Sequence, residues 1–303
     1  MHRSLLKTCP DFHLFVFAFD EISRGILEDM ALEKATIVSL KEFENKELLR
    51  AKADRSKAEY CWTCTPSVIE YCLNQYHIPE CTYIDADLYF FSDPTPLLRE
   101  LKEDCVLITS HRYTQKYDDS ATSGIYCVQF ITFRNNTNGR EVLLWWRDRC
   151  IEWCYARFED GKFGDQKYLD NWPIQFHGVH ELVHEGGGVA PWNIQQYEVH
   201  KNDRNFFIAN KKTGAVKELI FYHFHAVKFL KNNITDLGSY VLSKNSRQLY
   251  DIYVREIGEV NNDLIKLGFE TVVQPYKSKK YIPALVHKLI RRLVGVYNVM
   301  KIN

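Results

Sequence analysis

Residues 81–94 read Cys81-Thr-Tyr-Ile-Asp85-Ala-Asp87-Leu-Tyr-Phe-Phe-Ser-Asp-Pro94, and this stretch decides how the chain is interpreted. Apolar runs stand on both sides of the carboxylates Asp85 and Asp87, which indicates a buried strand that ends at the pair. Such a pair suits a hard divalent cation, which takes oxygen ligands and keeps positions open for phosphates. The simpler alternative is a solvated acidic turn, but the apolar flanks favour a metal site.

Composition narrows the class of protein. The chain has 303 residues, 46% of them hydrophobic, and a formal net charge of zero. This length allows one large α/β domain or two small ones. Zero net charge argues against a nucleic-acid-binding surface over the whole protein. Nine cysteines, no signal peptide and no run of about 18 apolar residues predict a cytoplasmic protein with reduced thiols.

Strands alternate with helices along the first half of the chain. This alternation predicts an α/β fold with a mixed, mostly parallel sheet flanked by helices. The expected strands cover 12–19, 35–40, the run from 82 that ends at Asp85 and Asp87, 105–110, 122–133 and 220–225. The expected helices cover 2–9, 21–32, 43–57, 66–75 and 139–158.

Two loops are rich in glycine and polar residues. Residues 161–168 contain Asp165 and Gln166, and residues 186–193 contain Gly188, Trp192 and Asn193. Neither loop has the spacing of a Walker or dinucleotide-binding motif. They are either plain connections or the walls of a site for a polar ligand that stacks on an aromatic ring.

Histidines and cysteines offer further candidate ligands. His223 and His225 share one face of the strand expected over 220–225, and a metal or phosphate role stands level with ordinary core or surface positions for them. The Cys-x-x-Cys at Cys61 and the helical pair at Cys150 and Cys154 could bind zinc. Packing is the preferred interpretation of both cysteine pairs, because no matching second pair of ligands is evident.

Five short motifs together resemble the GT-A glycosyltransferases, most closely the retaining, family-8-like enzymes that use nucleotide-diphosphate sugars. The resemblance covers roughly residues 11–230, and the motifs occur in the family's order. They are Tyr83-Ile-Asp-Ala-Asp87, Ser123-Gly124-Ile125, Asp165-Gln166, Trp192-Asn193 and His223-Phe-His-Ala226.

The resemblance implies a set of roles. Asp85, Asp87 and His223, with His225 as second choice, would bind Mn²⁺ or Mg²⁺ and so hold the two phosphates of a UDP-sugar. Asp165 and Gln166 would be catalytic residues beside the anomeric carbon. Further donor contacts would come from Arg55, Ala86, Ser123, Gly124 and Lys228, and the acceptor or sugar pocket from Gly188, Trp192 and Asn193.

The sequence also departs from the pattern of this family. No strand of the kind that opens the fold in this family is visible before residue 12, and we expect the usual first strand to be missing at the N-terminus. Trp62 stands near a position where relatives often carry a sugar-binding arginine, and Arg55 and Lys57 are the nearby cations.

The C-terminal region is basic. After Glu270 the sequence contains no acidic residue, and residues 283–300 have the spacing of an amphipathic helix. We expect a division into a transferase domain, 1–245, and a helical extension, 246–303. The helix either docks on the domain or lies on an anionic membrane surface, where it would bring the enzyme to a lipid-linked acceptor.

The sequence therefore predicts a metal-dependent, retaining hexosyltransferase that moves a hexose from a UDP-sugar to a cell-surface glycan or a lipid-linked glycan precursor. The alternatives are a non-catalytic GT-A-like binding domain and a sugar nucleotidyltransferase. A metal-dependent nuclease is disfavoured, because the basic surface with interleaved aromatic residues that it needs is absent from the sequence.

Overall fold

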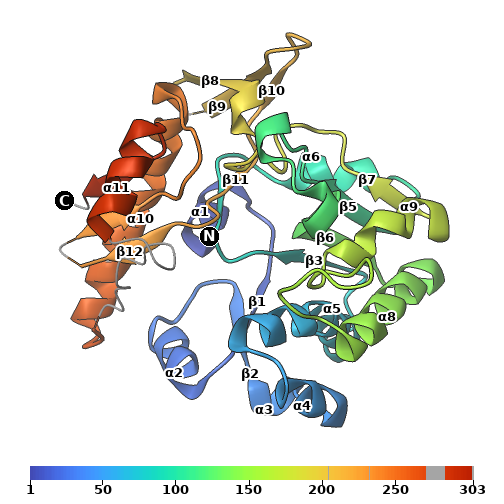
Figure 1. Cartoon of the computed structure of the whole chain (residues 1–303). Helices are drawn as coiled ribbons and strands as arrows, with labels where there is room; N and C mark the ends of the chain where they lie inside the picture. Colours follow the sequence, from blue (N-terminus) through green and yellow to red (C-terminus); the bar gives the residue numbers. More distant parts are fainter. Residues whose placement is uncertain (204, 232, 271–283, 302–303) are drawn as a thin grey trace.

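The computed structural model describes residues 1–203, 205–231, 233–270 and 284–301 (Figure 1). The helices are α1 (His2–Thr8), α2 (Glu21–Asp29), α3 (Leu40–Phe43), α4 (Lys46–Lys52), α5 (Lys57–Gln75), α6 (Thr95–Leu98), α7 (Ser120–Ser123), α8 (Thr137–Glu152), α9 (Trp172–Gln175), α10 (Lys244–Lys266) and α11 (Ala284–Leu293). The strands are β1 (Leu14–Ala18), β2 (Ala35–Ser39), β3 (Glu80–Ile84), β4 (Leu88–Phe90), β5 (Val106–Ser110), β6 (Tyr126–Arg134), β7 (Val179–Glu181), β8 (Tyr197–Asn202), β9 (Asn205–Asn210), β10 (Val216–Glu218), β11 (Phe221–His223), β12 (Lys228–Leu230), β13 (Ile234–Asp236) and β14 (Val299–Lys301).

The fold is mixed α/β, with several small sheets. The largest sheet has the order β3-β6-β5-β7, in which β6 runs antiparallel to both of its neighbours. Parallel ladders join only β1 to β2 and β5 to β7 in the described part of the chain, so the expectation of a mostly parallel sheet is wrong. The reason lies in the connection from β5 to β6. It contains no long helix that would carry the chain back across the sheet, and β6 therefore returns beside β5.

The β1–β2 pair remains separate from the larger sheet. A cavity of about 540 Å³ is lined by side chains of both, among them Phe15, Phe17 and Cys81. The described residues contain no strand that pairs with both β1 and β3, and a continuous sheet across this region is not observed.

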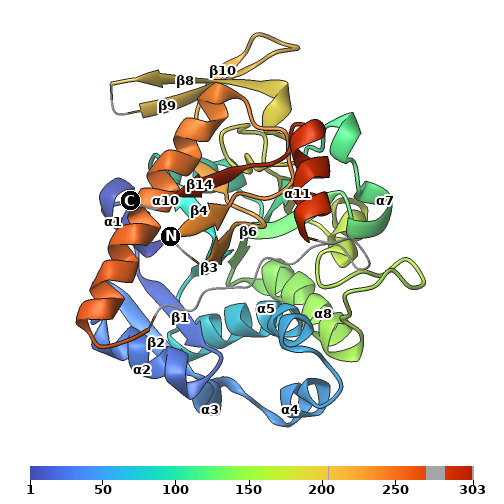
Figure 2. The same cartoon turned by 60° about the vertical axis from the view of Figure 1, so that its left-hand side comes forward.

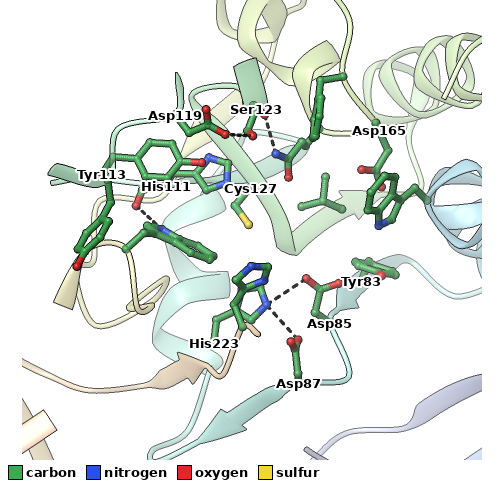
Figure 3. Close-up of a pocket in the computed structure, with 18 of the residues that line it drawn as sticks. Tyr83, Asp85, Asp87, His111, Tyr113, Asp119, Ser123, Cys127, Asp165 and His223 are labelled. Atoms are coloured by element: carbon green, nitrogen blue, oxygen red, sulfur yellow. Dashed lines mark hydrogen bonds and ion pairs between the residues drawn. The ribbon is translucent and has the colours of Figure 1, made fainter. Parts of the chain in front are cut away.

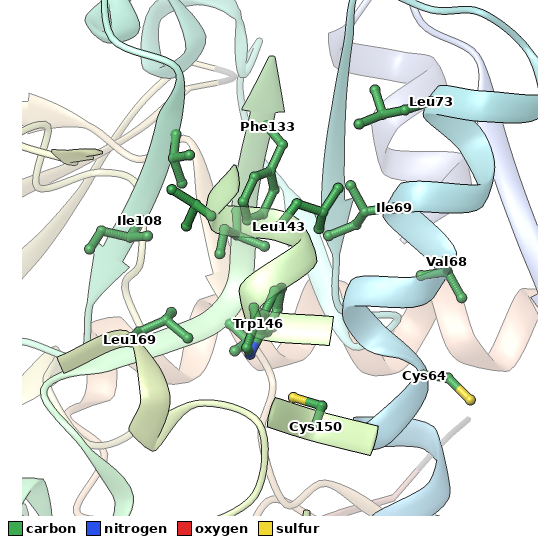
Figure 4. Close-up of a cluster of buried hydrophobic side chains, with 14 of the residues drawn as sticks. Cys64, Val68, Ile69, Leu73, Ile108, Phe133, Leu143, Trp146, Cys150 and Leu169 are labelled. Carbon is green, nitrogen blue, oxygen red and sulfur yellow. The ribbon is translucent and has the colours of Figure 1, made fainter. Parts of the chain in front are cut away.

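The main hydrophobic core lies between the larger sheet and helices α5 and α8. Phe133, Trp146 and Trp172 are fully buried, and their rings pack edge-to-face or stacked at centroid distances of 5.4–6.1 Å. Figure 4 shows Phe133 and Trp146 among the side chains of this core. Helix α5 begins at a capping box formed by Ser56 and Glu59, which satisfies backbone donors at its first turn. The sequence alone predicts that this helix begins at Pro66. The capping box explains why it begins nine residues earlier, at Lys57.

A second core positions the strand that carries His223. Helix α10 packs Tyr250 and Tyr253 against Phe224, and the rings of Phe224 and Tyr253 stack at 3.9 Å. Strand β11 pairs antiparallel with β4 in a register that sets His223 opposite Leu88. Figure 2 shows β4 beside α10, and the rings of Tyr89 on β4 and Tyr253 on α10 lie 6.3 Å apart. This pairing brings a histidine from late in the chain to the end of the Asp85–Asp87 segment.

The C-terminal helix is shorter than expected. Helix α11 ends at Leu293, Gly295 adopts a positive φ of 71°, and the chain continues into strand β14. A helix over all of 283–300 is therefore wrong, because the glycine lets the backbone turn out of the helix. Among the described helices, none has the length and apolar character needed to cross a bilayer.

Candidate metal and substrate site

Two carboxylates and an imidazole meet at the junction of β3, β4 and β11. The ligand atoms of Asp85, Asp87 and His223 all lie within 4.8 Å of one another (Figure 3). His223 Nε2 is 3.0 Å from Asp87 Oδ1 and 3.8 Å from Asp85 Oδ2. Backbone hydrogen bonds hold this arrangement in place: Asp85 N donates to Gln129 O, and Phe224 N donates to Asp87 O.

Side chains around the cluster orient its members. His223 Nδ1 donates to Oε1 of the buried Gln129 at 2.8 Å, which leaves Nε2 directed at the two carboxylates. Tyr83 Oη donates to Asp85 Oδ1 at 2.9 Å. An acceptor on the remote ring nitrogen is the usual support of a metal-binding histidine. Two carboxylates and one such imidazole can therefore hold a divalent metal ion and leave other coordination positions open.

The charges in the cluster shift one another's pKa values. Burial disfavours protonation of His223, but the hydrogen bond to Asp87, helped by Cys127 and Asp85, raises its pKa well above the usual value. Removal from water raises the pKa of Asp85. The same desolvation acts on Asp87, but its bond to His223 more than offsets it and lowers the pKa. The positive charge of a protonated His223 therefore balances part of the negative charge of Asp85 and Asp87.

The cluster lies in a cavity of about 530 Å³. Asp165 and Gln166 line it from the loop after α8, and Gln166 Nε2 donates to Ser123 O at 2.6 Å. Asp165 is buried, and this burial raises the pKa of its carboxyl to about 7. The loop is fixed by the indole of Trp146, which donates to the Asp165 carbonyl at 2.8 Å. Asp165 is therefore held in place and can be neutral or ionised near neutral pH.

Aromatic rings form another wall of the cavity. His111 and Tyr113 stack at 4.5 Å, and Trp192 packs edge-on against His111 and His223 at 5.4 and 5.3 Å. Trp192 Nε1 donates to His111 O at 2.9 Å, so the ring is held firmly. Tyr240 completes this side of the lining. Rings presented next to polar groups suit a sugar or a nucleobase.

The structure brings together eight of the residues that the sequence singled out. They line one cavity and are Asp85, Asp87, Ser123, Asp165, Gln166, Trp192, His223 and His225.

Other expected site residues lie outside this lining. Arg55 is held by Asp54, Tyr155 and backbone carbonyls, and its side chain is only 2% exposed. Asn193 is fully buried and donates to the carbonyls of His111 and Gly188. Ala86 faces the separate cavity beside β1, and Lys228 is exposed on β12.

The two expected glycines have backbone roles. Gly188 has φ +95°, and a Cβ there would come within 2.7 Å of Thr109 Cγ2. Gly124 has φ +101° next to Lys167 and Asp170. Both therefore shape the loops that carry the lining residues.

Several lining residues were missed by the sequence analysis. They include His111, Tyr113, Tyr117, Asp119, Cys127 and Tyr240. His111 directly follows a buried strand, which is a signal that could have found it. Cys127 lies inside β6 and offered no such signal. Burial disfavours its thiolate, but the neighbouring His111 and His223 lower its pKa to about 7.

Two proteins of Bacillus subtilis are similar to this chain in sequence. The chain is 30% identical over 289 residues to the uncharacterized protein YfnD of Bacillus subtilis, and the match covers 93% of this chain and 91% of YfnD. It is 31% identical over 242 residues to the uncharacterized protein YfnF of the same organism, across 77% of this chain and 78% of YfnF. No protein-family model matches.

Solved structures with a partly similar course of the chain include mouse xyloside xylosyltransferase 1 in its apo form. Its TM-score is 0.44 at 12% sequence identity, over 74% of this chain and 89% of that chain. A197 from STIV gives a TM-score of 0.27 at 11% identity, over 68% of this chain and 92% of that chain. At these TM-scores neither likeness establishes a shared fold or a function.

Proposed function

The chain belongs to the family of the Bacillus subtilis proteins YfnD and YfnF, and for this member we propose a metal-dependent glycosyltransferase of the GT-A type. One observation carries the proposal: Asp85, Asp87 and His223 converge within 4.8 Å in a cavity that also holds Asp165 and an aromatic wall. The donor in this proposal is a UDP-hexose, and the ion is Mn²⁺ or Mg²⁺.

Asp85, Asp87 and His223 would hold the ion. A divalent ion bound there would act as a Lewis acid and stabilise the negative charge that builds up on a diphosphate leaving group. Gln129 and Tyr83 serve this cluster indirectly, because they set the directions of His223 Nε2 and of the Asp85 carboxylate. Their hydrogen bonds keep the ligands in place before substrate enters.

Asp165 and Gln166 would face the sugar of the donor. With a pKa near 7, Asp165 can donate a hydrogen bond to a sugar hydroxyl or, when ionised, stabilise positive charge near the anomeric carbon. Gln166 is tied to Ser123 and keeps its amide oxygen available. We assign no covalent nucleophile, and retention of configuration is part of the proposal through same-face attack.

Trp192, with Tyr113 and Tyr240, would form the platform for a sugar ring of the acceptor. The acceptor proposed is a cell-surface glycan or its lipid-linked precursor. A cytoplasmic location and the division into a domain, 1–245, and an extension, 246–303, belong to the same proposal.

Calorimetric titration of UDP into the purified chain, with and without Mn²⁺, tests the proposal. We expect binding that requires Mn²⁺ and is lost in Asp87→Asn. Asp160→Asn is the matched control, because Asp160 lies in a turn with φ +50° that asparagine tolerates equally well. Mn²⁺-dependent UDP binding that survives in Asp87→Asn would refute the metal site.

Hydrolysis of UDP-sugars then separates transfer from mere binding. A transferase releases some sugar to water, whereas a non-catalytic binding domain releases none. A well-folded chain that binds UDP and Mn²⁺ but hydrolyses no donor would therefore support the binding-domain alternative. Release of pyrophosphate from UTP and a sugar phosphate would instead indicate a sugar nucleotidyltransferase.

A further inference from the structure

Helix α11 exposes its apolar side. Leu285 is 80% exposed, Leu289 55% and Leu293 78%, and Val286 and Ile290 are also exposed. With about 3.6 residues per turn, these five residues cover one continuous side of the helix. An amphipathic helix that simply docks on its own domain buries this side, so α11 is oriented the other way round.

A buried ion pair holds α11 in this orientation. Arg291 is 5% exposed, and its Nη1 and Nη2 donate to the two oxygens of Asp236 at 2.6 and 2.7 Å. Its Nη2 also donates to Gly238 O at 2.8 Å. On the helix, Arg291 lies roughly opposite the middle of the apolar side. The bidentate pair therefore turns the leucines toward the outside of the molecule.

Cations border the exposed apolar side. Lys288 and Arg292 lie next to Leu285 and Leu289 around the helix, and α11 contains no acidic residue. We infer that α11 is a membrane-docking surface that inserts Leu285, Leu289 and Leu293 into the interface of an anionic leaflet while the exposed Arg292 meets the lipid headgroups. An apolar side edged by basic residues is the pattern of helices that lie in the plane of a bilayer surface.

The charge of the helix favours a lipid surface over a second copy of the chain. Two copies that met through this side would bring Lys288 and Arg292 near their equivalents, and like charges repel. An anionic leaflet complements the same cations. Exposed leucines are also better accommodated in acyl chains than in water.

Hydrogen bonds connect α11 and the residues that follow it to the segment that carries Tyr240. Arg291 bonds to Gly238 O, and Asn298, just after α11, donates to Tyr240 O at 2.7 Å. Tyr240 lines the cavity that holds Asp87 and His223. A leaflet bound to α11 would therefore lie near this side of the cavity. The membrane inference itself does not depend on the proposed transferase activity.

Flotation with vesicles tests the inference on the full chain. We expect the protein to float with phosphatidylcholine vesicles that contain about a third phosphatidylglycerol, and to float poorly with pure phosphatidylcholine or at high salt. Leu285→Asp combined with Leu293→Asp should weaken binding at least about tenfold. Arg292→Glu should weaken it by a factor of about five or more.

Matched controls lie elsewhere on the surface. Ile174→Asp replaces another highly exposed aliphatic residue, 87% exposed on α9, and Lys212→Glu reverses an exposed cation. Both should leave vesicle binding unchanged. Thermal unfolding of each variant checks that the fold is intact.

Three results would overturn the inference. They are failure of the wild-type chain to float with anionic vesicles, flotation unaffected by the two leucine substitutions, and equal losses in Ile174→Asp. A chain that ignores vesicles but sediments as a dimer, and becomes a monomer in the double leucine variant, would assign this surface to a second copy. UDP binding measured on the same samples reports on the proposed function separately.

Discussion

Gln129→Leu provides a sharp test of how the candidate metal site is built. Gln129 is fully buried in β6, and its Oε1 accepts from His223 Nδ1 at 2.8 Å. Loss of such a partner of a metal-binding histidine typically weakens metal affinity 10- to 100-fold, or about 1.4–2.8 kcal/mol. We expect a weakening of this size for Mn²⁺ binding.

The same substitution should leave the free energy of unfolding nearly unchanged. Leucine leaves the buried Nδ1–H of His223 without its acceptor, which costs about 1–3 kcal/mol. However, Gln129 Nε2 is itself buried and has no hydrogen-bond partner among the described residues, so its removal relieves a penalty of similar size. The two effects oppose each other, and loss of metal affinity should dominate.

Mn²⁺ titration followed by electron paramagnetic resonance, together with urea unfolding, checks both expectations. Thr132→Val is the matched control in the same strand. It removes the 2.9 Å bond between Thr132 and Thr82 and should lower stability by about 1 kcal/mol without a change in Mn²⁺ affinity. Gln129→Glu keeps an acceptor and should keep the affinity. Wild-type Mn²⁺ affinity in Gln129→Leu would show that His223 is not held by this bond or is not a ligand.

Three further predictions concern charge and stability. The pKa of Asp165, raised to about 7 by burial, means that ionisation opposes folding as pH rises from about 4 to 7, so Asp165→Asn should raise Tm more at pH 8 than at pH 5 while donor turnover is lost; an equal shift at both pH values would contradict the raised pKa. The pKa of Glu59 is lowered to about 2, chiefly by the backbone N–H of Ala156, so its stabilising effect is fully present above about pH 4.5 and is lost as pH falls toward 2; Glu59→Gln should therefore lower Tm at pH 7 and lose most of that difference at pH 2.5, as thermal unfolding followed by circular dichroism would show. Arg291→Met leaves Asp236 buried without its cation and should destabilise the chain by about 3–5 kcal/mol in urea unfolding, whereas a change below about 1 kcal/mol would mean that α11 is not anchored by this pair.

Local pattern was sufficient to find individual elements and half of the site. Apolar runs located β1, β2, β3, β5, β6 and β11 to within a few residues, but no strand was expected at β7–β10 or β12–β14. The Asp85–Asp87 pair was recognisable because the residues on both sides of it are apolar. Loops with Asp165 and Trp192 were recognisable from glycine and polar content. Each of these signals lies within a few neighbouring residues, where backbone preference and side-chain burial act directly.

Strand direction and the C-terminal helix show where that reasoning stops. Whether β6 runs parallel or antiparallel depends on how the chain returns after β5, and no local pattern records this. The amphipathic pattern of α11 gave its apolar side correctly but not its orientation. That orientation depends on Arg291 finding Asp236, 55 residues earlier in the chain.

The sequence by itself determined which segments are buried, which turns carry carboxylates, and where a basic helix stands. Only the tertiary structure decided that Gln129 of β6 orients His223 of β11, and that Cys127, His111 and Tyr240 share a cavity with Asp87. The physical reason is that burial and turn formation follow from local composition. Contacts between distant strands are instead selected by the packing of the whole core, to which every element contributes.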